Sequence, residues 1–411
     1  MNSIAGFFHC TSTRMAGSPY QASLPAHREG APLLSRPNAL CTSLIATAGE
    51  VVAQLPDRDL RAAVLFGSVA WGDADEASDL DLMLLLDQPA GYREVTRLRV
   101  ADLLGRPLPD GPRFIDLDRR SAQTFEEGEG RWFQRIVNSI ILADTDGWYE
   151  GIRVQTTDEY ATPACRRARW QDYAERANTE RAALSRAREM GDGPLAALYG
   201  RLAVETAAAG LVDLHDDRVS LTHFIENVER ALRARGKEAL LPLVLQTFAL
   251  EAVAAEDAER SLAAYRRFAG VLEAWMAEPD VVGRLSAEDA AWAAFTYGAE
   301  TYEEIDYKVA GFRKAGRSAA LQFYLDGLLT TLIRMNLGKV LRLRERGSAG
   351  IPAMPEFQGL LRVHPALSDA WLAALRLDGS ARRLEVAEAL AGELLDLGQQ
   401  VVTGADGMAP T

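Results

Sequence analysis

The chain is poor in cysteine. Only three of its 411 residues are cysteines, Cys10, Cys41 and Cys165, and they are far apart in the sequence. An odd number of scattered thiols offers neither a disulfide framework nor a cysteine metal cluster, and it is typical of a reducing compartment. The sequence therefore excludes small disulfide-stapled secreted domains and cysteine zinc modules.

Long hydrophobic runs are also lacking. The longest apolar stretch, residues 239–255, is interrupted by Pro242, Gln246 and Glu251, which favours a buried helix over a membrane span. Residues 1–8 have neither the basic region nor the apolar length of a secretory signal. We therefore expect a soluble cytoplasmic protein that does not act at a membrane.

Positive charge is in deficit. The sequence has 45 Lys and Arg against 58 Asp and Glu, a formal net charge of −13. Because long nucleic acids bind cationic surfaces, we do not expect one as a partner. A nucleotide stays compatible with this balance, since a metal ion neutralises its charge locally. At 411 residues the chain is long enough for two or three domains.

Two apolar segments joined by an acidic one stand out between residues 62 and 87. The first ends on Gly67-Ser68, and ten residues later the second opens with Asp79-Leu80-Asp81-Leu82. Side chains alternate along a strand, so Asp79 and Asp81 would share a face about two rises of 3.3 Å apart. Two carboxylates so placed repel each other unless a divalent cation lies between them.

The Gly67-Ser68 pair suits phosphate. Gly67 has no Cβ, so the chain can turn sharply there and bring backbone N–H groups close to a ligand. Ser68 adds a hydroxyl and an amide at the expected start of a helix. A phosphate cradle beside paired carboxylates is the equipment of metal-assisted nucleotidyl transfer. The alternative is an acidic surface loop before an ordinary strand, with Asp79 as a cap and Asp81 at a strand edge.

The combined pattern resembles the polymerase-β-like nucleotidyltransferase superfamily, over about residues 60–120 only. The resemblance implies that Asp79 and Asp81 bind Mg²⁺ in a two-metal site. It implies that Gly67 and Ser68 hold the phosphates of a nucleoside triphosphate, with ATP as the expected donor. It also implies a third acidic metal ligand on a neighbouring strand.

Residues 113–118 predict that neighbouring strand. Asp116 and Asp118 share a face on it, and Asp116 has the apolar neighbours Ile115 and Leu117 that the third ligand needs. Asp116 is therefore the preferred third carboxylate, as metal ligand and as a catalytic residue. Asp118 remains the alternative, and so does a strand-end aspartate that faces water.

The sequence divides into four parts. Residues 1–38, rich in Ser, Pro and Gly, predict a disordered N-terminal extension. Residues 39–160 predict an α/β nucleotidyltransferase head, a small mixed sheet with flanking helices. Its expected helices include residues 39–55, 92–104 and 132–139. Residues 161–402 predict a large all-α helical domain, and residues 403–411 a frayed tail.

Seven helices are expected in the helical domain, several of them broken internally. Their ranges are 166–190, 194–214, 220–235, 239–275, 287–308, 319–346 and 369–397. Arginines crowd the first of these ranges and could face a triphosphate, but the interleaved acidic residues favour an ion-paired, solvated face.

A head followed by helices resembles the aminoglycoside and lincosamide nucleotidyltransferases, in which the helices help to form the acceptor pocket. In some of these relatives a glutamate of the helical domain is the general base. Glu205, a carboxylate within an apolar helix, is the candidate here; the alternatives are that it pairs with Arg201 or faces water.

The resulting hypothesis is a metal-dependent nucleotidyltransferase. It would transfer a nucleoside monophosphate from a triphosphate to a hydroxyl of a small-molecule acceptor, such as an antibiotic, and release pyrophosphate. The alternatives are nucleotidylation of protein or tRNA in a toxin–antitoxin-like system, and a non-catalytic nucleotide-binding scaffold. The sequence leaves monomer and dimer open.

Overall fold

A computed structural model describes residues 39–57, 59–106, 112–126, 133–337, 339–340, 343 and 380–404. The described chain falls into two compact units, one that ends at Ala161 and one that begins at Thr162. The predicted N-terminal extension, residues 1–38, and most of the predicted tail lie outside the described residues.

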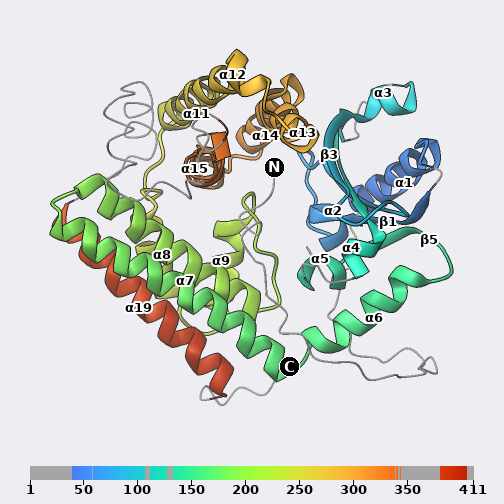
Figure 1. Ribbon diagram of the computed structural model, residues 1–411. Coiled ribbons are helices and arrows are strands. Elements are labelled where there is room, and N and C mark those ends of the chain that lie inside the picture. Colours follow the sequence, from blue (N-terminus) through green and yellow to red (C-terminus); the bar gives the residue numbers. More distant parts are fainter. Residues whose placement is uncertain are drawn as a thin grey trace. The chain divides into compact units, whose positions relative to one another are not determined.

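A five-stranded mixed sheet forms the centre of the first unit, which we call the head (Figure 1). Its strands are β1 (Leu60–Phe66), β2 (Leu80–Leu86), β3 (Arg93–Arg99), β4 (Phe114–Ser121) and β5 (Ile140–Asp144). They lie in the order β3-β4-β2-β1-β5. β2 runs parallel to β4, and the other pairs are antiparallel. The predicted α/β head with a small mixed sheet is confirmed.

Helices pack on both faces of this sheet. Helices α1 (Ala39–Gln54) and α3 (Val100–Leu104) share a core with one face, to which Leu82 and Leu117 contribute. Helices α4 (Ala122–Glu126), α5 (Phe133–Val137) and α6 (Trp148–Tyr160) share a core with the other. β2 is almost wholly buried because both of its faces are covered, which explains its near-continuous apolar sequence.

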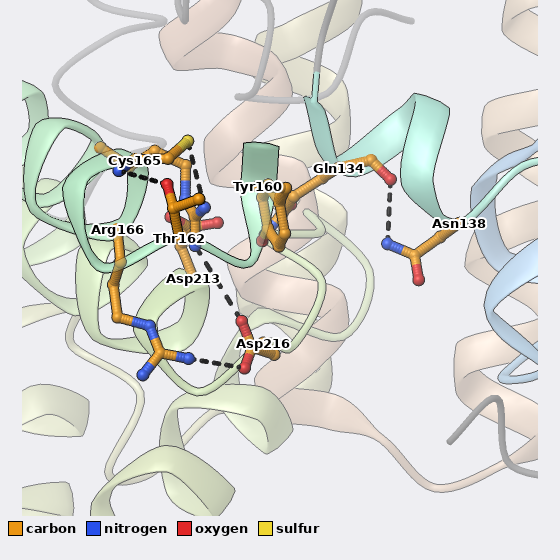
Figure 2. Close-up of polar contacts among 9 residues, drawn as sticks. Gln134, Asn138, Tyr160, Thr162, Cys165, Arg166, Asp213 and Asp216 are labelled. Carbon is orange, nitrogen blue, oxygen red and sulfur yellow. Dashed lines mark hydrogen bonds and ion pairs between the residues drawn. The ribbon is translucent and has the colours of Figure 1, made fainter. Parts of the chain in front are cut away.

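α5 and α6 are also joined by side-chain contacts. Gln134 Nε2 of α5 donates a hydrogen bond to the Tyr160 hydroxyl of α6 at 3.4 Å. At the end of α5 itself, Asn138 Nδ2 donates to the backbone carbonyl of Gln134 at 2.9 Å (Figure 2). Phe133 packs against the Tyr160 ring, with the centroids 6.4 Å apart. The short helix α5 thus has a fixed place beside the sheet.

The predicted helix over residues 92–104 is wrong. Residues 93–99 form strand β3, and only Val100–Leu104 is helical. The apolar residues Val95 and Leu98 fit a helical stripe, but they also fit an edge strand that pairs antiparallel with β4. Pairing in the sheet overrides the local pattern. As a strand, β3 brings Arg97 opposite Asp116.

The regular elements of the second unit are all helices in its described residues, as predicted. Its main helices are α7 (Pro163–Glu189), α8 (Gly193–Leu214), α9 (Phe224–Arg233), α10 (Leu241–Thr247), α11 (Ala255–Met276), α12 (Pro279–Val282), α13 (Ala287–Tyr297), α14 (Ala299–Lys314), α15 (Ser318–Thr331) and α19 (Ala381–Thr403). α7, α8 and α19 pack side by side (Figure 1). α8 is long and apolar enough to cross a membrane, but 83% of its apolar window is buried, as in the core helix of a globular unit.

Two of the predicted helices are split. The range 239–275 divides into a short 3₁₀ turn, α10 and α11, with Ala249 at a positive φ of 53° between α10 and α11. The range 287–308 divides at Gly298 into α13 and α14. A Cβ on Gly298 would lie 2.4 Å from the Ala294 carbonyl oxygen, so this break needs glycine.

The arginines of α7 form ion pairs within the helical unit. Thr162 begins the helix by accepting a hydrogen bond from the Cys165 amide at 3.1 Å (Figure 2). Arg166 then pairs with Asp216 at 3.1 Å, and Arg169 Nε donates to Asp213 Oδ2 at 2.9 Å. These two arginines are ion-paired, but with Asp213 and Asp216 instead of the interleaved acidic residues, and the largely buried side chain of Arg169 is not part of a solvated face.

Trp170 of α7 is enclosed by glycines of two neighbouring helices. Its side chain is 1% exposed. A Cβ on Gly210 of α8 would lie 2.7 Å from the Trp170 ring, and one on Gly398 of α19 would lie 2.1 Å from it. The indole therefore occupies the space that side chains at these two positions would need.

Gly398→Ala is expected to destabilise the helical unit. Alanine normally stabilises an exposed helix by about 1 kcal/mol relative to glycine, but overpacking a core costs about 1–3 kcal/mol. At a separation of 2.1 Å the clash with Trp170 should dominate. The matched control is Gly270→Ala on α11, where a Cβ would meet nothing within 4 Å and stability should rise. Urea unfolding of both variants measures this; an equal gain in both would contradict the account.

Candidate active site

A tight turn delivers Asp79 to the start of β2. Asp75 Oδ1 accepts hydrogen bonds from the Ala77 amide at 3.0 Å and from Ser78 Oγ at 3.2 Å. Ser78 Oγ in turn accepts from the Asp75 amide at 2.9 Å. Aspartate and serine are suited to such local side-chain-to-backbone bonds. The turn fixes the direction in which the chain enters the strand, and so the place of Asp79.

Three carboxylates meet at this end of the sheet. Asp79, Asp81 and Asp116 each offer an oxygen, and these oxygens all lie within 4.8 Å of one another. Asp81 and Asp116 are opposite each other on the paired strands β2 and β4. Asp79 and Asp81 are half-buried, and Asp116 is buried. Asp118, the alternative, is not in the group.

The geometry fits a divalent cation. Mg²⁺ binds oxygen ligands at about 2.0–2.1 Å, so two oxygens across one ion are about 4.2 Å apart. The spacing within 4.8 Å is therefore in the range that shared ions need. Three carboxylates without a histidine or cysteine among them are hard oxygen ligands, typical of Mg²⁺ and Mn²⁺ rather than zinc.

Gly67 touches this group directly. Its φ is +71°, a conformation that favours glycine, and a Cβ here would lie 1.9 Å from Asp81 Oδ2. The backbone at the end of β1 thus passes directly against a carboxylate of the triad. A side chain at position 67 would collide with Asp81.

Residues 50–123 match the family model of the nucleotidyltransferase domain. This segment holds all three carboxylates together with Gly67 and Ser68. The match is consistent with the polymerase-β-like nucleotidyltransferase expected from the sequence, and it covers part of the head alone. No curated protein matches the chain.

Ser68 lies in the matched segment, at the start of the short helix α2 (Gly67–Trp71). Its side chain is buried, and its carbonyl accepts a hydrogen bond from the Asp73 amide at 3.1 Å. Gly72 ends the helix in the left-handed conformation. The structure places Ser68 next to Gly67 and its carboxylate contact; binding of phosphate by this pair stays a prediction.

Arg97, which also lies in the matched segment, was missed in the sequence because residues 92–104 predicted a helix. Its Nε and Nη2 donate hydrogen bonds of 2.6 Å to the two carboxylate oxygens of Asp116. Burial raises the pKa of the Asp116 carboxyl, but the charge and hydrogen bonds of Arg97 outweigh this effect and hold the pKa below its usual range. The only apolar residues of 93–99, Val95 and Leu98, are three positions apart, so the segment has no strand-type alternation that could have signalled β3.

Arg135 of α5 is the second missed residue. Its guanidinium lies over the Phe66 ring, 4.5 Å from the centroid, just before Gly67. Burial lowers the pKa of Arg135 to about 10, while the nearby charges of Asp81 and Asp118 oppose that shift. Arg135 thus adds a second arginine to the surroundings of the triad. Its sequence context, a short amphipathic helix, carried no sign of this position.

Asp118 belongs to a separate group of ions. It pairs with Arg120 at 2.5 Å and with Arg93 at 3.4 Å. Burial raises the pKa of Asp118, but the hydrogen bond and charge of Arg120, with the charge of Arg93, lower it below its usual range. Because its oxygens are directed to arginines, Asp118 has a structural role in the head.

Asp118→Asn is expected to destabilise the head by about 3–5 kcal/mol at pH 7, since it breaks a buried ion pair and leaves Arg120 without its carboxylate. The lowered pKa of Asp118 means that its contribution is complete above the ordinary value of about 3.9 and is lost as the pH falls through the folded-state pKa. The difference between wild type and variant should therefore shrink below about pH 4. Urea unfolding at several pH values measures both effects.

The control for Asp118→Asn is Asp102→Asn. Asp102 is 73% exposed in its side chain, and its oxygen is 3.9 Å from Arg99. An exposed pair of this kind contributes about 0.5 kcal/mol or less. Equal effects of the two substitutions would show that burial of the Asp118 group does not matter.

Glu205 lies on α8 of the helical unit. It is 6% exposed, so the alternative that it faces water is wrong. One turn earlier, Arg201 Nη1 pairs with Asp326 Oδ2 at 2.8 Å. The role of Glu205 as a general base stays a prediction.

Proposed function

We propose that this protein is a metal-dependent nucleotidyltransferase with ATP as donor and a hydroxyl-bearing small molecule as acceptor. The observation that carries the proposal is the convergence of Asp79, Asp81 and Asp116 beside the Gly67 backbone. The family match over residues 50–123 supports nucleotidyl transfer in general. The antibiotic-type acceptor rests on the resemblance of a head with a helical domain, and the cytoplasmic location on the scarcity of cysteine.

In the proposed reaction an acceptor oxygen attacks the α-phosphorus of the triphosphate, and pyrophosphate leaves as the bond to the bridging oxygen breaks. Asp79, Asp81 and Asp116 would hold Mg²⁺, which when bound stabilises negative charge on the attacking and leaving oxygens. Gly67 and Ser68 would place the terminal phosphates at the end of β1. The carboxylates, through the bound Mg²⁺, would thus hold the triphosphate and the acceptor oxygen at this end of the sheet.

Asp116 is better suited to hold a cation than to accept the acceptor proton. Both of its oxygens already accept hydrogen bonds from Arg97, and its pKa lies below the usual range. A group with a lowered pKa is a weak base near neutral pH. Another residue is therefore needed as general base, and Glu205 is the candidate that the sequence offers.

A transfer assay tests the proposal. The purified chain is incubated with each nucleoside triphosphate, Mg²⁺ and a panel of hydroxyl-bearing compounds that includes aminoglycosides. We expect pyrophosphate release together with an acceptor mass increased by one nucleotide. Absence of any triphosphate binding by calorimetry in the presence of Mg²⁺ would overturn the assignment.

The same chain with labelled triphosphate in a cell extract separates the rival functions. Label in small molecules supports the proposal. Label in protein or tRNA would identify a macromolecular nucleotidylating enzyme instead, and nucleotide binding without any transfer would identify a scaffold.

A further inference from the structure

Arg97 approaches the carboxylate triad from the edge of the sheet. On adjacent strands, Arg97 lies opposite Asp116, and Asp116 lies opposite Asp81. Residues that oppose each other on paired strands share a face of the sheet. The guanidinium therefore reaches Asp116 from the β3 side, and Asp81 lies on the opposite, β2 side of Asp116.

The ion pair between Arg97 and Asp116 is bidentate and buried. The Nε···Oδ1 and Nη2···Oδ2 distances are both 2.6 Å, and the Arg97 side chain is 1% exposed. A planar guanidinium that donates two parallel hydrogen bonds fixes the plane of the carboxylate. Each carboxylate oxygen has two lone pairs, so an oxygen that accepts one hydrogen bond from Arg97 can also bind a cation.

The triad needs such support. Its three carboxylates bring oxygens within 4.8 Å of one another, and like charges at this range repel. Asp116 is the buried member and so has the least water to stabilise its charge. Without an oriented partner it would rotate away from Asp79 and Asp81.

We infer that Arg97 is a positioning residue that holds Asp116 in the orientation required to share a divalent cation with Asp79 and Asp81. The inference rests on the proposed function. Groups that orient a metal ligand through hydrogen bonds typically affect metal affinity by about 10–100-fold.

The test is the affinity of the full chain for Mn²⁺. The electron paramagnetic resonance signal of the free ion measures how much Mn²⁺ stays unbound, and so gives the dissociation constant. Arg97→Met should weaken binding by about 10–100-fold, and Arg97→Lys, which keeps the charge but not the fork, should weaken it less. Arg99→Met on the same strand is the matched control, because Arg99 is a surface residue paired with Asp102. It should bind Mn²⁺ within about twofold of wild type.

A double variant separates positioning from general loss of structure. Asp116→Asn alone should weaken Mn²⁺ binding, and Arg97→Met added to it should cost less than about twofold more, because the partner is already gone. An equal loss from Arg97→Met in both backgrounds, or wild-type affinity in Arg97→Met, would overturn the inference. Failure of the wild type to bind Mn²⁺ would instead overturn the proposed function together with it. Circular dichroism of each variant reports folding.

Discussion

Asp79→Asn and Asp81→Asn are each expected to lower kcat/KM for nucleotidyl transfer by about 10³-fold or more. Each substitution removes one charged oxygen ligand from a group whose oxygens lie within 4.8 Å. Loss of about 4 kcal/mol of charge stabilisation in the transition state corresponds to that factor. Pyrophosphate release with saturating Mg²⁺ measures it.

The same substitutions should leave the head folded. In the metal-free protein each of them relieves repulsion within the triad, so the free energy of unfolding should stay equal or rise. Asp87→Asn, just after the far end of β2, is the control. Asp87 is exposed, and its ion pair with Arg61, at 3.7 Å, lies at the surface. It should retain full transfer activity. Near-normal turnover in both Asp79→Asn and Asp81→Asn would defeat the assignment of these carboxylates.

Gly67→Ala is expected to lose both stability and activity. Position 67 has a φ of +71°, which costs a non-glycine residue about 1–2 kcal/mol, and the new methyl group would start 1.9 Å from Asp81 Oδ2. Asp81 must move to make room, and a displacement of about 1 Å in an active site can cost about 10²-fold in rate. Transfer kinetics and urea unfolding measure the two losses.

Gly105→Ala separates the two contributions. Gly105 also has a positive φ, +62°, but a Cβ there would meet nothing within 4 Å. It should share the conformational cost of Gly67→Ala and keep its transfer activity. If the two variants lost activity equally, the contact between Gly67 and Asp81 would have no part in the site.

The local part of the site could be predicted from the sequence. Gly67-Ser68, Asp79 and Asp81 lie within fifteen residues, from the end of β1 to the start of β2, which one short helix and a turn join. Their spacing predicts a cation site, because side chains alternate along a strand and Asp79 and Asp81 therefore share a face. The prediction of Asp116 also required a third strand, which the apolar neighbours of Asp116 indicated. The family match over 50–123 agrees with this reasoning.

The charged partners of the triad could not be predicted in this way. Arg97 becomes meaningful only once β3 pairs antiparallel with β4, and an amphipathic pattern of this length fits a helix as well as an edge strand. Arg135 comes from a five-residue helix whose position depends on packing against α6. Such contacts join elements far apart in the chain, and tertiary packing decides them.

In the helical unit, too, the sequence predicted the type of the elements but not their ends. Composition was enough to predict helices, because Ala, Leu, Arg and Glu favour them. Their ends depend on single residues such as Gly298, whose Cβ would strike a backbone oxygen, and Ala249 at positive φ. Periodicity extends through such positions, so it overestimates helix length.

The most direct test is a crystal structure with Mn²⁺ and a non-hydrolysable nucleoside triphosphate, analysed by anomalous scattering. We predict manganese between Asp79, Asp81 and Asp116, with the triphosphate on the Gly67-Ser68 side. Manganese bound elsewhere while these three carboxylates stay without metal, or a triphosphate remote from Gly67, would contradict the account.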